Sequence, residues 1–335
     1  MIMDISIPYY SDLTRISNSN IGWFLEKGPA YLHKMLTNPP PEEKNPVLER
    51  GTMIHEYILQ PEEFNKDYVV WTDAKPTSAQ QETFCKEFAN TLEIEPDKAV
   101  LSAYKKAYST RGKSDDLMLS EGREIALKLV KYIDFLKSRD TRKMISIWDV
   151  KMLEKIKHNI QSHKLARLLL DTNKHDNIET WHEFHINWEY IVNDAIGSSS
   201  IACKSLLDGL TLDFKNKEVI IYDLKTTQKL WHFEDSMIAY NYLRQLCYYT
   251  MAVNWYLSEE LKEDPKKWKY KWYIIGIDTT GTNEIRVFEF TENQVFIMYN
   301  TIVRALNDIR WHQKTDKWDH SREYYEGNGA ESLIL

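Results

Sequence analysis

The feature that most constrains the fold is a change in hydrophobic period near residue 178. Before that point apolar residues recur every three or four positions, which is the spacing of a helix. After it they alternate, as side chains do on a strand with one buried face. The alternation predicts strands at 179–191, 198–214 and 219–227, then a hairpin from 271–280 and 284–291. With Asn216 in the turn, the second and third strands should pair antiparallel, which gives an α/β (α+β) chain.

Helical patterns lie on both sides of these strands. An N-terminal helix is expected after Ser17 or Ser19 as its N-cap, with a break at Gly28–Pro29. A second helix over 48–64 carries an apolar stripe that includes Met53 and Ile54. Toward the C-terminus, single long helices are predicted over 237–257 and 292–311.

The segment 72–175 is interpreted as a helical insertion. It contains helical patterns over 77–92, 121–137 and 145–170, and the last opens with Ser146 and Asp149 as a variant capping box. The polar stretch around Arg111 and Lys113 is either a DNA-facing loop or an ordinary solvated one, and base rates for loops favour the second. We therefore divide one domain into an N-terminal helical part, an insertion, and a sheet with C-terminal helices, at 1–71, 72–175 and 176–335.

Composition excludes several classes of protein. Apolar residues make up 43% of the 335 positions, which is typical of a globular fold. No run approaches the roughly 18 uncharged residues of a membrane span, so a soluble, cytoplasmic protein is expected. The three cysteines lack metal-type spacing and are expected to be reduced thiols. With a net charge of -7, any nucleic acid must be held by a local patch rather than by a global basic field.

The strand that begins at Val219 ends in charge. Alternate side chains share a face, so Asp223 and Lys225 follow apolar residues on the same side of the strand. Pairing with the preceding strand brings Asp208 close to Asp223, and Glu183 lies one strand further away. Two such charges about 4 Å apart repel by roughly 4 kcal/mol at an effective dielectric near 20. Either the carboxylates splay into water or a divalent cation neutralises them, and hard oxygen ligands without thiolates suit Mg²⁺ or Mn²⁺.

These residues carry a family resemblance. The stretch "LLDGLTLDFKNKEVIIYDLKTT" looks like the core of the PD-(D/E)xK nuclease superfamily. More closely, "RGTMIHEYILQPEEF", "EFHINW", "CKSLLD", "DLKTT" and "RQLCYY" resemble, in order, motifs of phage recombination exonucleases of the exonuclease VIII (RecE) and RecB-nuclease type. The resemblance covers 12–70 and 178–250. It implies a restriction-endonuclease-like core, that is, a central mixed sheet flanked by helices.

The resemblance also implies roles for individual residues. Metal ligands would be His55, Glu183, Asp208, Asp223 and the carbonyl of Leu224, and catalytic residues would be Glu183, Asp208, Asp223 and Lys225. Contacts to DNA would come from Lys204, Thr226, Thr227, Gln245 and Tyr249. The usual Arg-Pro before the first Asp is Leu206-Leu207 here, so one DNA-contacting arginine is absent.

The expected function is a Mg²⁺- or Mn²⁺-dependent exonuclease that degrades duplex DNA in recombination or repair, in a bacterial or phage-infected cell. Two alternatives stay open: a structure-selective or single-strand endonuclease on the same fold, and a non-catalytic DNA-binding module. The resemblance to these exonucleases further implies that the protein forms a homo-oligomer and acts with a partner that anneals single strands.

Overall fold

The computed structural model describes residues 8–41, 45–91, 95–172, 176–194 and 197–331. The chain forms two compact units, one of residues 1–61 with 153–335 and one of residues 62–152. The second unit is shorter than the segment 72–175, because most of helix α8 (Ile147–Ser162) and all of α9 (Lys164–Leu169) belong to the first. Among the described helices, none combines the length and the apolar character needed to span a bilayer.

The first unit is built on a five-stranded mixed sheet with the order β3-β4-β5-β6-β7. Neighbouring strands pair antiparallel except β5 and β6, which are parallel. The strands are β3 (Ile178–Asp194), β4 (Gly197–Asp213), β5 (Glu218–Thr227), β6 (Lys269–Asp278) and β7 (Ile285–Phe290). The mixed sheet flanked by helices that the sequence predicted is therefore confirmed.

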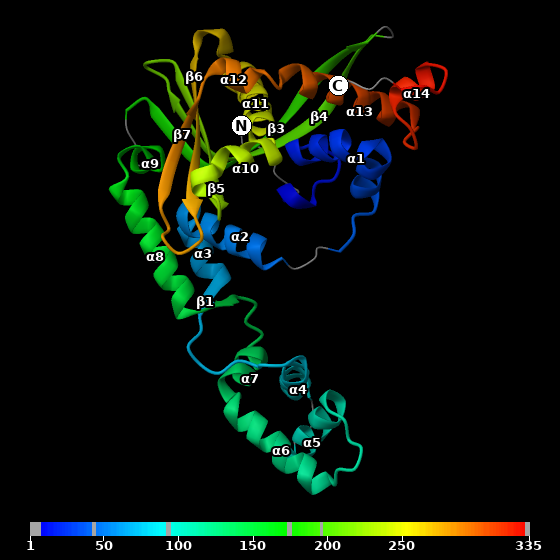
Figure 1. Ribbon diagram of the computed structural model, residues 1–335, viewed down its shortest axis with the longest axis vertical. Coiled ribbons are helices and arrows are strands. Elements are labelled where there is room, and N and C mark those ends of the chain that lie inside the picture. The colour runs from blue at the N-terminus through cyan, green and yellow to red at the C-terminus, as the bar shows by residue number, and fades with distance from the viewer. Residues whose placement is uncertain (1–7, 42–44, 92–94, 173–175, 195–196, 332–335) are drawn as a thin grey trace. The chain divides into compact units, whose positions relative to one another are not determined.

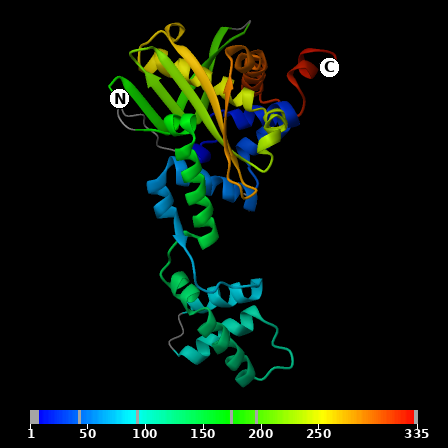
Figure 2. The same ribbon diagram turned by 60° about the vertical axis from the view of Figure 1, so that its left-hand side comes forward.

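Helix α11 (Tyr242–Trp255) connects the two parallel strands and packs across one face of the sheet (Figures 1 and 2). It contacts β3, β4 and β5, and α13 (Tyr299–Thr315) lies beside it against β3. Helix α1 (Asn18–Thr37) packs on α13 in turn. The core between these layers is apolar and includes Trp188, Leu210, Ile221, Leu246 and Tyr248, all almost fully buried.

Local sequence signals account for several helix ends. Ser17, not Ser19, caps α1 in a reciprocal capping box with Asn20. Gly28 adopts a φ of +81° that kinks α1 just before Pro29, as expected from this pair. Helix α2 (Pro46–Leu59) begins with proline at its first position and continues into α3 (Pro61–Asp67) after Gln60.

Two predicted long helices are each broken in the structure. The expected helix over 237–257 is α10 (Phe233–Ala239) followed by α11, with Asn241 between them at a φ of +50°. The expected helix over 292–311 is α12 (Glu292–Phe296) followed by α13. Apolar periodicity runs through both breaks, so the periodicity alone could not reveal them. Among the described residues of this unit, α14 (Arg322–Glu326) is the last α-helix along the chain.

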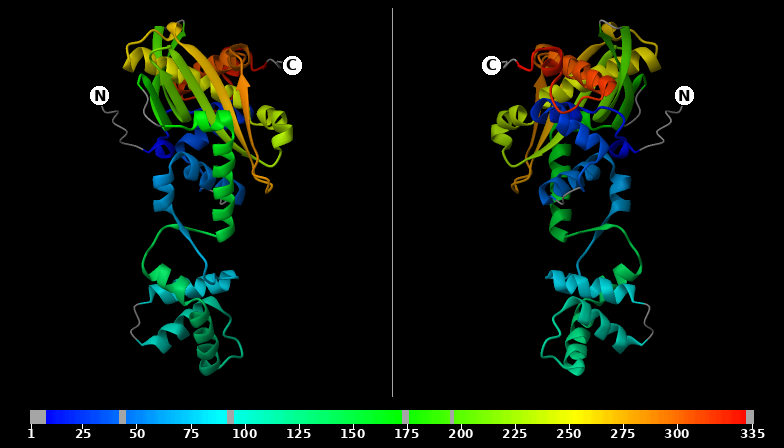
Figure 3. Two further views of the ribbon diagram at one scale, coloured as in Figure 1. Left: turned by 90° about the vertical axis from the view of Figure 1, so that its left-hand side faces the viewer. Right: turned by 90° about the vertical axis from the view of Figure 1, so that its right-hand side faces the viewer.

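Besides most of α3 and the start of α8, the described residues of the second unit form four helices and a two-stranded parallel sheet (Figure 3). Its elements are β1 (Tyr68–Val70), α4 (Ala79–Asn90), α5 (Pro96–Ala107), α6 (Asp115–Lys128), α7 (Val130–Lys137) and β2 (Lys143–Ile145). Phe84, Val100 and Tyr104 form part of its own small core. The expected helix over 121–137 is split between α6 and α7 at Leu129.

Candidate active site

Three acidic residues, Glu183, Asp208 and Asp223, occupy one row across the sheet, which we call the acid row. The register pairs His182 with Gly209 and Phe184 with Leu207, which places Glu183 beside Asp208. The ladder from β4 to β5 ends at the pair Gly209–Tyr222, one step before Asp208 and Asp223. Residues opposite each other on neighbouring strands share a face, so the three carboxylates are directed to the same side.

The backbone changes at this row. Glu183 has a φ of +49° in the middle of β3, a left-handed conformation that disfavours L-residues with a Cβ by roughly 1–2 kcal/mol. On β4, the space left by the end of the ladder is used by the Asp208 side chain, whose Oδ2 accepts the Leu224 N–H at 2.7 Å. Next to it, the Tyr222 ring covers Gly209 so closely that no Cβ could fit there. Strain of this kind at a cluster of acids points to a functional site rather than a packing site.

His55 completes a set of candidate metal ligands. The ligand atoms of His55, Glu183 and Asp208 all lie within 4.8 Å of one another, and His55 Nδ1 is 3.6 Å from Asp208 Oδ2. Burial and the Lys225 ammonium lower the pKa of His55 to about 4, so its imidazole is neutral at pH 7 and can ligate. The Leu224 backbone also hydrogen-bonds His55, which brings the predicted carbonyl ligand to the same place.

The pKa values of the three acids are raised by their surroundings. Burial, together with the charges of Asp208, Asp223 and Glu56, raises the pKa of Glu183 to about 8. Burial and the Asp208 charge raise the pKa of Asp223 to about 6, and burial raises the pKa of Asp208. Glu183, Asp208 and Asp223 thus lie close together, and the hydrogen bonds that they accept do not offset the repulsion between their charges. Hard oxygens around one neutral imidazole fit a divalent cation such as Mg²⁺ or Mn²⁺.

Lys225 supplies the positive charge of the site. Its Nζ lies 2.5 Å from Asp223 Oδ2 and 5.1 Å from the centre of the Tyr242 ring. Burial lowers the pKa of Lys225, but the Asp223 and Asp208 charges outweigh that effect and the net pKa is raised. The side chain is therefore a cation at neutral pH.

Gln245 and Tyr249 lie one turn apart on α11 and face the site, as their spacing predicted. Gln245 Nε2 donates to Asp223 Oδ1 at 2.9 Å and to the Tyr249 hydroxyl at 2.7 Å. Tyr249 is only 7% exposed. In this structure the pair braces Asp223, and contact of either residue with DNA stays a prediction.

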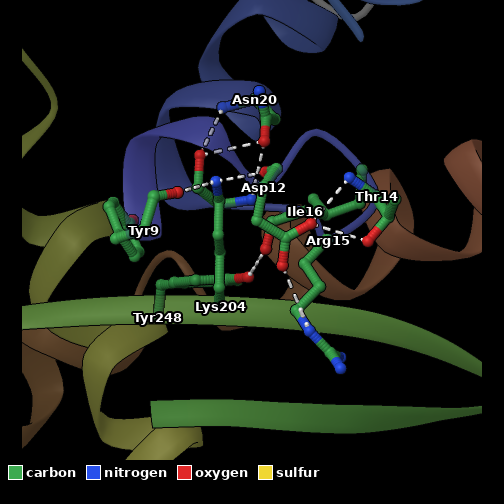
Figure 4. Close-up of polar contacts among 9 residues, drawn as sticks. Tyr9, Asp12, Thr14, Arg15, Ile16, Asn20, Lys204 and Tyr248 are labelled. Carbon is green, nitrogen blue, oxygen red and sulfur yellow. Dashed lines mark hydrogen bonds and ion pairs between the residues drawn. The ribbon is translucent and has the colours of Figure 1, made fainter. Parts of the chain in front are cut away.

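Lys204 lies on β4 but is engaged elsewhere. The side chain is 5% exposed, and its ammonium donates to the carbonyl of Tyr9 at 2.5 Å and to that of Asp12 (Figure 4). The Tyr248 hydroxyl, on α11, donates to the carbonyl of Ile16, which belongs to the same N-terminal segment as Tyr9 and Asp12. Lys204 therefore fixes the N-terminal segment against the sheet, and its contact with DNA stays a prediction.

Thr226 and Thr227, at the end of β5, line a cavity of about 500 Å³ next to the acids. Three neighbours of the site were not identified from the sequence: Glu56, Tyr10 and Tyr242. Of these three, only Glu56 could have been indicated by a motif, because it directly follows His55 in "MIHEYI". In the second unit, Lys113 pairs with Glu121 at 2.5 Å, and the interpretation of its loop as an ordinary solvated one stays a prediction.

Comparison with known proteins adds little to this geometry. No family model matches the chain, and no curated protein matches it. A solved structure from Eubacterium rectale, described as a "Putative exonuclease", is 10% identical with a TM-score of 0.47, and the match covers 100% of this chain and 96% of that one. At this distance the likeness carries no argument about activity, and the functional conclusion rests on the acid row itself.

Proposed function

We propose that the protein is a divalent-metal-dependent deoxyribonuclease that hydrolyses phosphodiester bonds, and that it acts as an exonuclease on duplex DNA in recombination or repair. The observation that carries the proposal is the convergence of Glu183, Asp208 and Asp223 from adjacent strands beside a neutral His55. A purely structural sheet gains nothing from acids whose pKa values are raised by one another. Perturbed acids next to a lysine in a cleft are typical of catalytic sites.

The donor set indicates which residues would hold the metal. His55, Glu183, Asp208 and Asp223 would supply side-chain ligands, with the carbonyl of Leu224 as a further oxygen. A bound Mg²⁺ or Mn²⁺ supplies an activated water and offsets the charge of the phosphate.

The protein's own groups have separate tasks. Lys225, as an ammonium, would hold a phosphoryl oxygen and orient the attacking water, and its raised pKa argues against its acting as the base before DNA and metal bind. Gln245 keeps Asp223 in place through its hydrogen bond. Thr226 and Thr227 would contact the strand as it leaves the acids.

The direct test uses linear and closed-circular duplex DNA with Mg²⁺ or with EDTA. We expect degradation of the linear duplex in Mg²⁺, no reaction in EDTA, and no degradation by Asp223→Ala. Glu189→Gln, an exposed acid on the same sheet, is the matched control and should be as active as the unaltered protein. Degradation of linear DNA by Asp223→Ala would refute the assignment of the site.

The two alternatives give different results in the same experiment. Cutting of the closed circle would favour an endonuclease. If neither DNA is cut, calorimetric titration with Mn²⁺ decides the rest, because a non-catalytic module would bind no ion. Binding of Mn²⁺ by the unaltered protein and loss of binding in Asp208→Asn would support the metal site.

A further inference from the structure

A cavity next to the acid row is not explained by the metal site. Its volume is about 500 Å³, within the roughly 300–1,000 Å³ of ligand-binding cavities. It starts at Thr226, the residue after Lys225, and extends between the N-terminal half of α2 and helix α10. Its lining includes Arg50, Thr226, Thr227, Lys229, Tyr240 and Tyr242.

The unexpected break between α10 and α11 shapes this cavity. In a continuous helix, Tyr240 and Tyr242 would point about 200° apart, because each residue turns by about 100°. The left-handed conformation of Asn241 instead stacks their rings, with centroids 5.8 Å apart and planes 21° apart. Tyr242 also carries the Lys225 ammonium over its ring. The stack therefore leads from the catalytic lysine out to the surface.

The outer end of this stack is open. Tyr240 is 67% exposed, although an aromatic ring is usually covered. Two exposed cations, Arg50 and Lys229, also line the cavity, together with one acid, Asp235. An exposed aromatic face beside cations matches a ligand that has both a flat ring and a negative charge. A nucleotide of a single strand has both.

We infer that this cavity binds an unpaired nucleotide of the DNA strand next to the bond that is cut, with its base on Tyr240 and its phosphate at Arg50 and Lys229. The inference rests on the proposed function, because that function makes DNA the ligand. It predicts that the strand is separated from its complement where it enters the site.

The test measures binding in EDTA, where no cleavage occurs. A fluorescently labelled single-stranded oligonucleotide is compared with a series in which one base at a time is removed to leave an abasic sugar. One position should lose about tenfold in affinity, or about 1.4 kcal/mol, because the stacking of its base on the aromatic ring is lost. In Tyr240→Ala that position should become as tolerant as the others, and Tyr240→Phe should behave like the unaltered protein.

Two controls make the result specific. Tyr299→Ala removes another partly exposed tyrosine, away from the cavity, and should keep the abasic effect. For the phosphate, Arg50→Gln or Lys229→Gln should reduce the slope of log affinity against log salt by about 0.7 per lost contact, and exposed Lys262→Gln should not.

Failure of this inference is separable from failure of the proposed function. If the protein degrades linear DNA but every abasic position costs the same in Tyr240→Ala and in the unaltered protein, only the cavity assignment is overturned. If the oligonucleotide does not bind and DNA is not cut in Mg²⁺, both are overturned.

Discussion

Asp223 lies near the middle of β5, and Asp278 is the last residue of the neighbouring parallel strand β6, four rungs further along the ladder. Both are almost completely buried, with 1% and 5% of their surface exposed. Asp278 accepts hydrogen bonds from the backbone N–H groups of Thr280, Thr282 and Asn283 and from the hydroxyls of both threonines. Asp223 has the Gln245 amide and the Lys225 ammonium, but it also faces Asp208.

The pKa values move in opposite directions as a result. Burial raises the pKa of Asp278, but the hydrogen bonds from Thr282 and Thr280 outweigh it and the net pKa is lowered. For Asp223, burial and the Asp208 charge raise the pKa to about 6. One carboxylate is satisfied by its own loop, which is a structural use of a buried acid. The other belongs to a row of acids that repel one another, and we propose that a divalent cation neutralises this row.

The largest expected effect comes from breaking the acid row. Asp208→Asn should lower nuclease activity by about 10³-fold, or about 4 kcal/mol, while the melting temperature changes by only a few degrees. The amide oxygen can still accept the Leu224 N–H, and the repulsion with Asp223 and Glu183 is removed. Activity assays and thermal unfolding in EDTA check both halves. Full activity would show that the row is not the catalytic site.

A substitution at Asp278 should have the opposite result: a large loss of stability and little change in activity. Asp278→Ala removes five hydrogen bonds and should lower the free energy of unfolding by about 2–4 kcal/mol, since those to a charged acceptor are the stronger kind. The catalytic rate of the folded protein should be nearly unchanged at a temperature well below the transition. Denaturant unfolding and activity at low temperature separate the two, and a large loss of rate without loss of stability would contradict the comparison.

A smaller effect is expected at low pH, where protonation of Asp278 removes the contribution of its charge to the free energy of unfolding. The folded-state pKa lies below the ordinary value of 3.8, so the stabilisation is fully present above that value. It is then lost as the pH falls through the folded-state pKa. The difference in unfolding free energy between the unaltered protein and Asp278→Asn should therefore shrink below about pH 4. A constant difference down to pH 2 would show that the charge of Asp278 contributes nothing.

The sequence predicted the acid row but not the features that tune it. The alternation of β5 and the turn at Asn216 were enough to bring Asp208 and Asp223 together, because strand register follows from both. The positive φ of Glu183 and of Asn241 did not show in the pattern, since apolar periodicity continues through both positions. The partners of Lys204 could not be predicted either, because the backbone carbonyls of Tyr9 and Asp12 are distant in the chain and no motif encodes them.

The smallest expected effect concerns the donors of Asp223. Tyr249→Phe removes the hydroxyl that accepts from Gln245, so the Gln245 amide should hold Asp223 less firmly. One neutral hydrogen bond contributes about 1 kcal/mol, which predicts a fall of about fivefold in kcat with little change in KM. Tyr248→Phe, whose hydroxyl bonds the Ile16 carbonyl instead, is the matched control and should lose stability but keep kcat. A rise in KM with unchanged kcat in Tyr249→Phe would mean that the hydroxyl binds DNA, as the sequence motif implies, and that Asp223 needs no such brace.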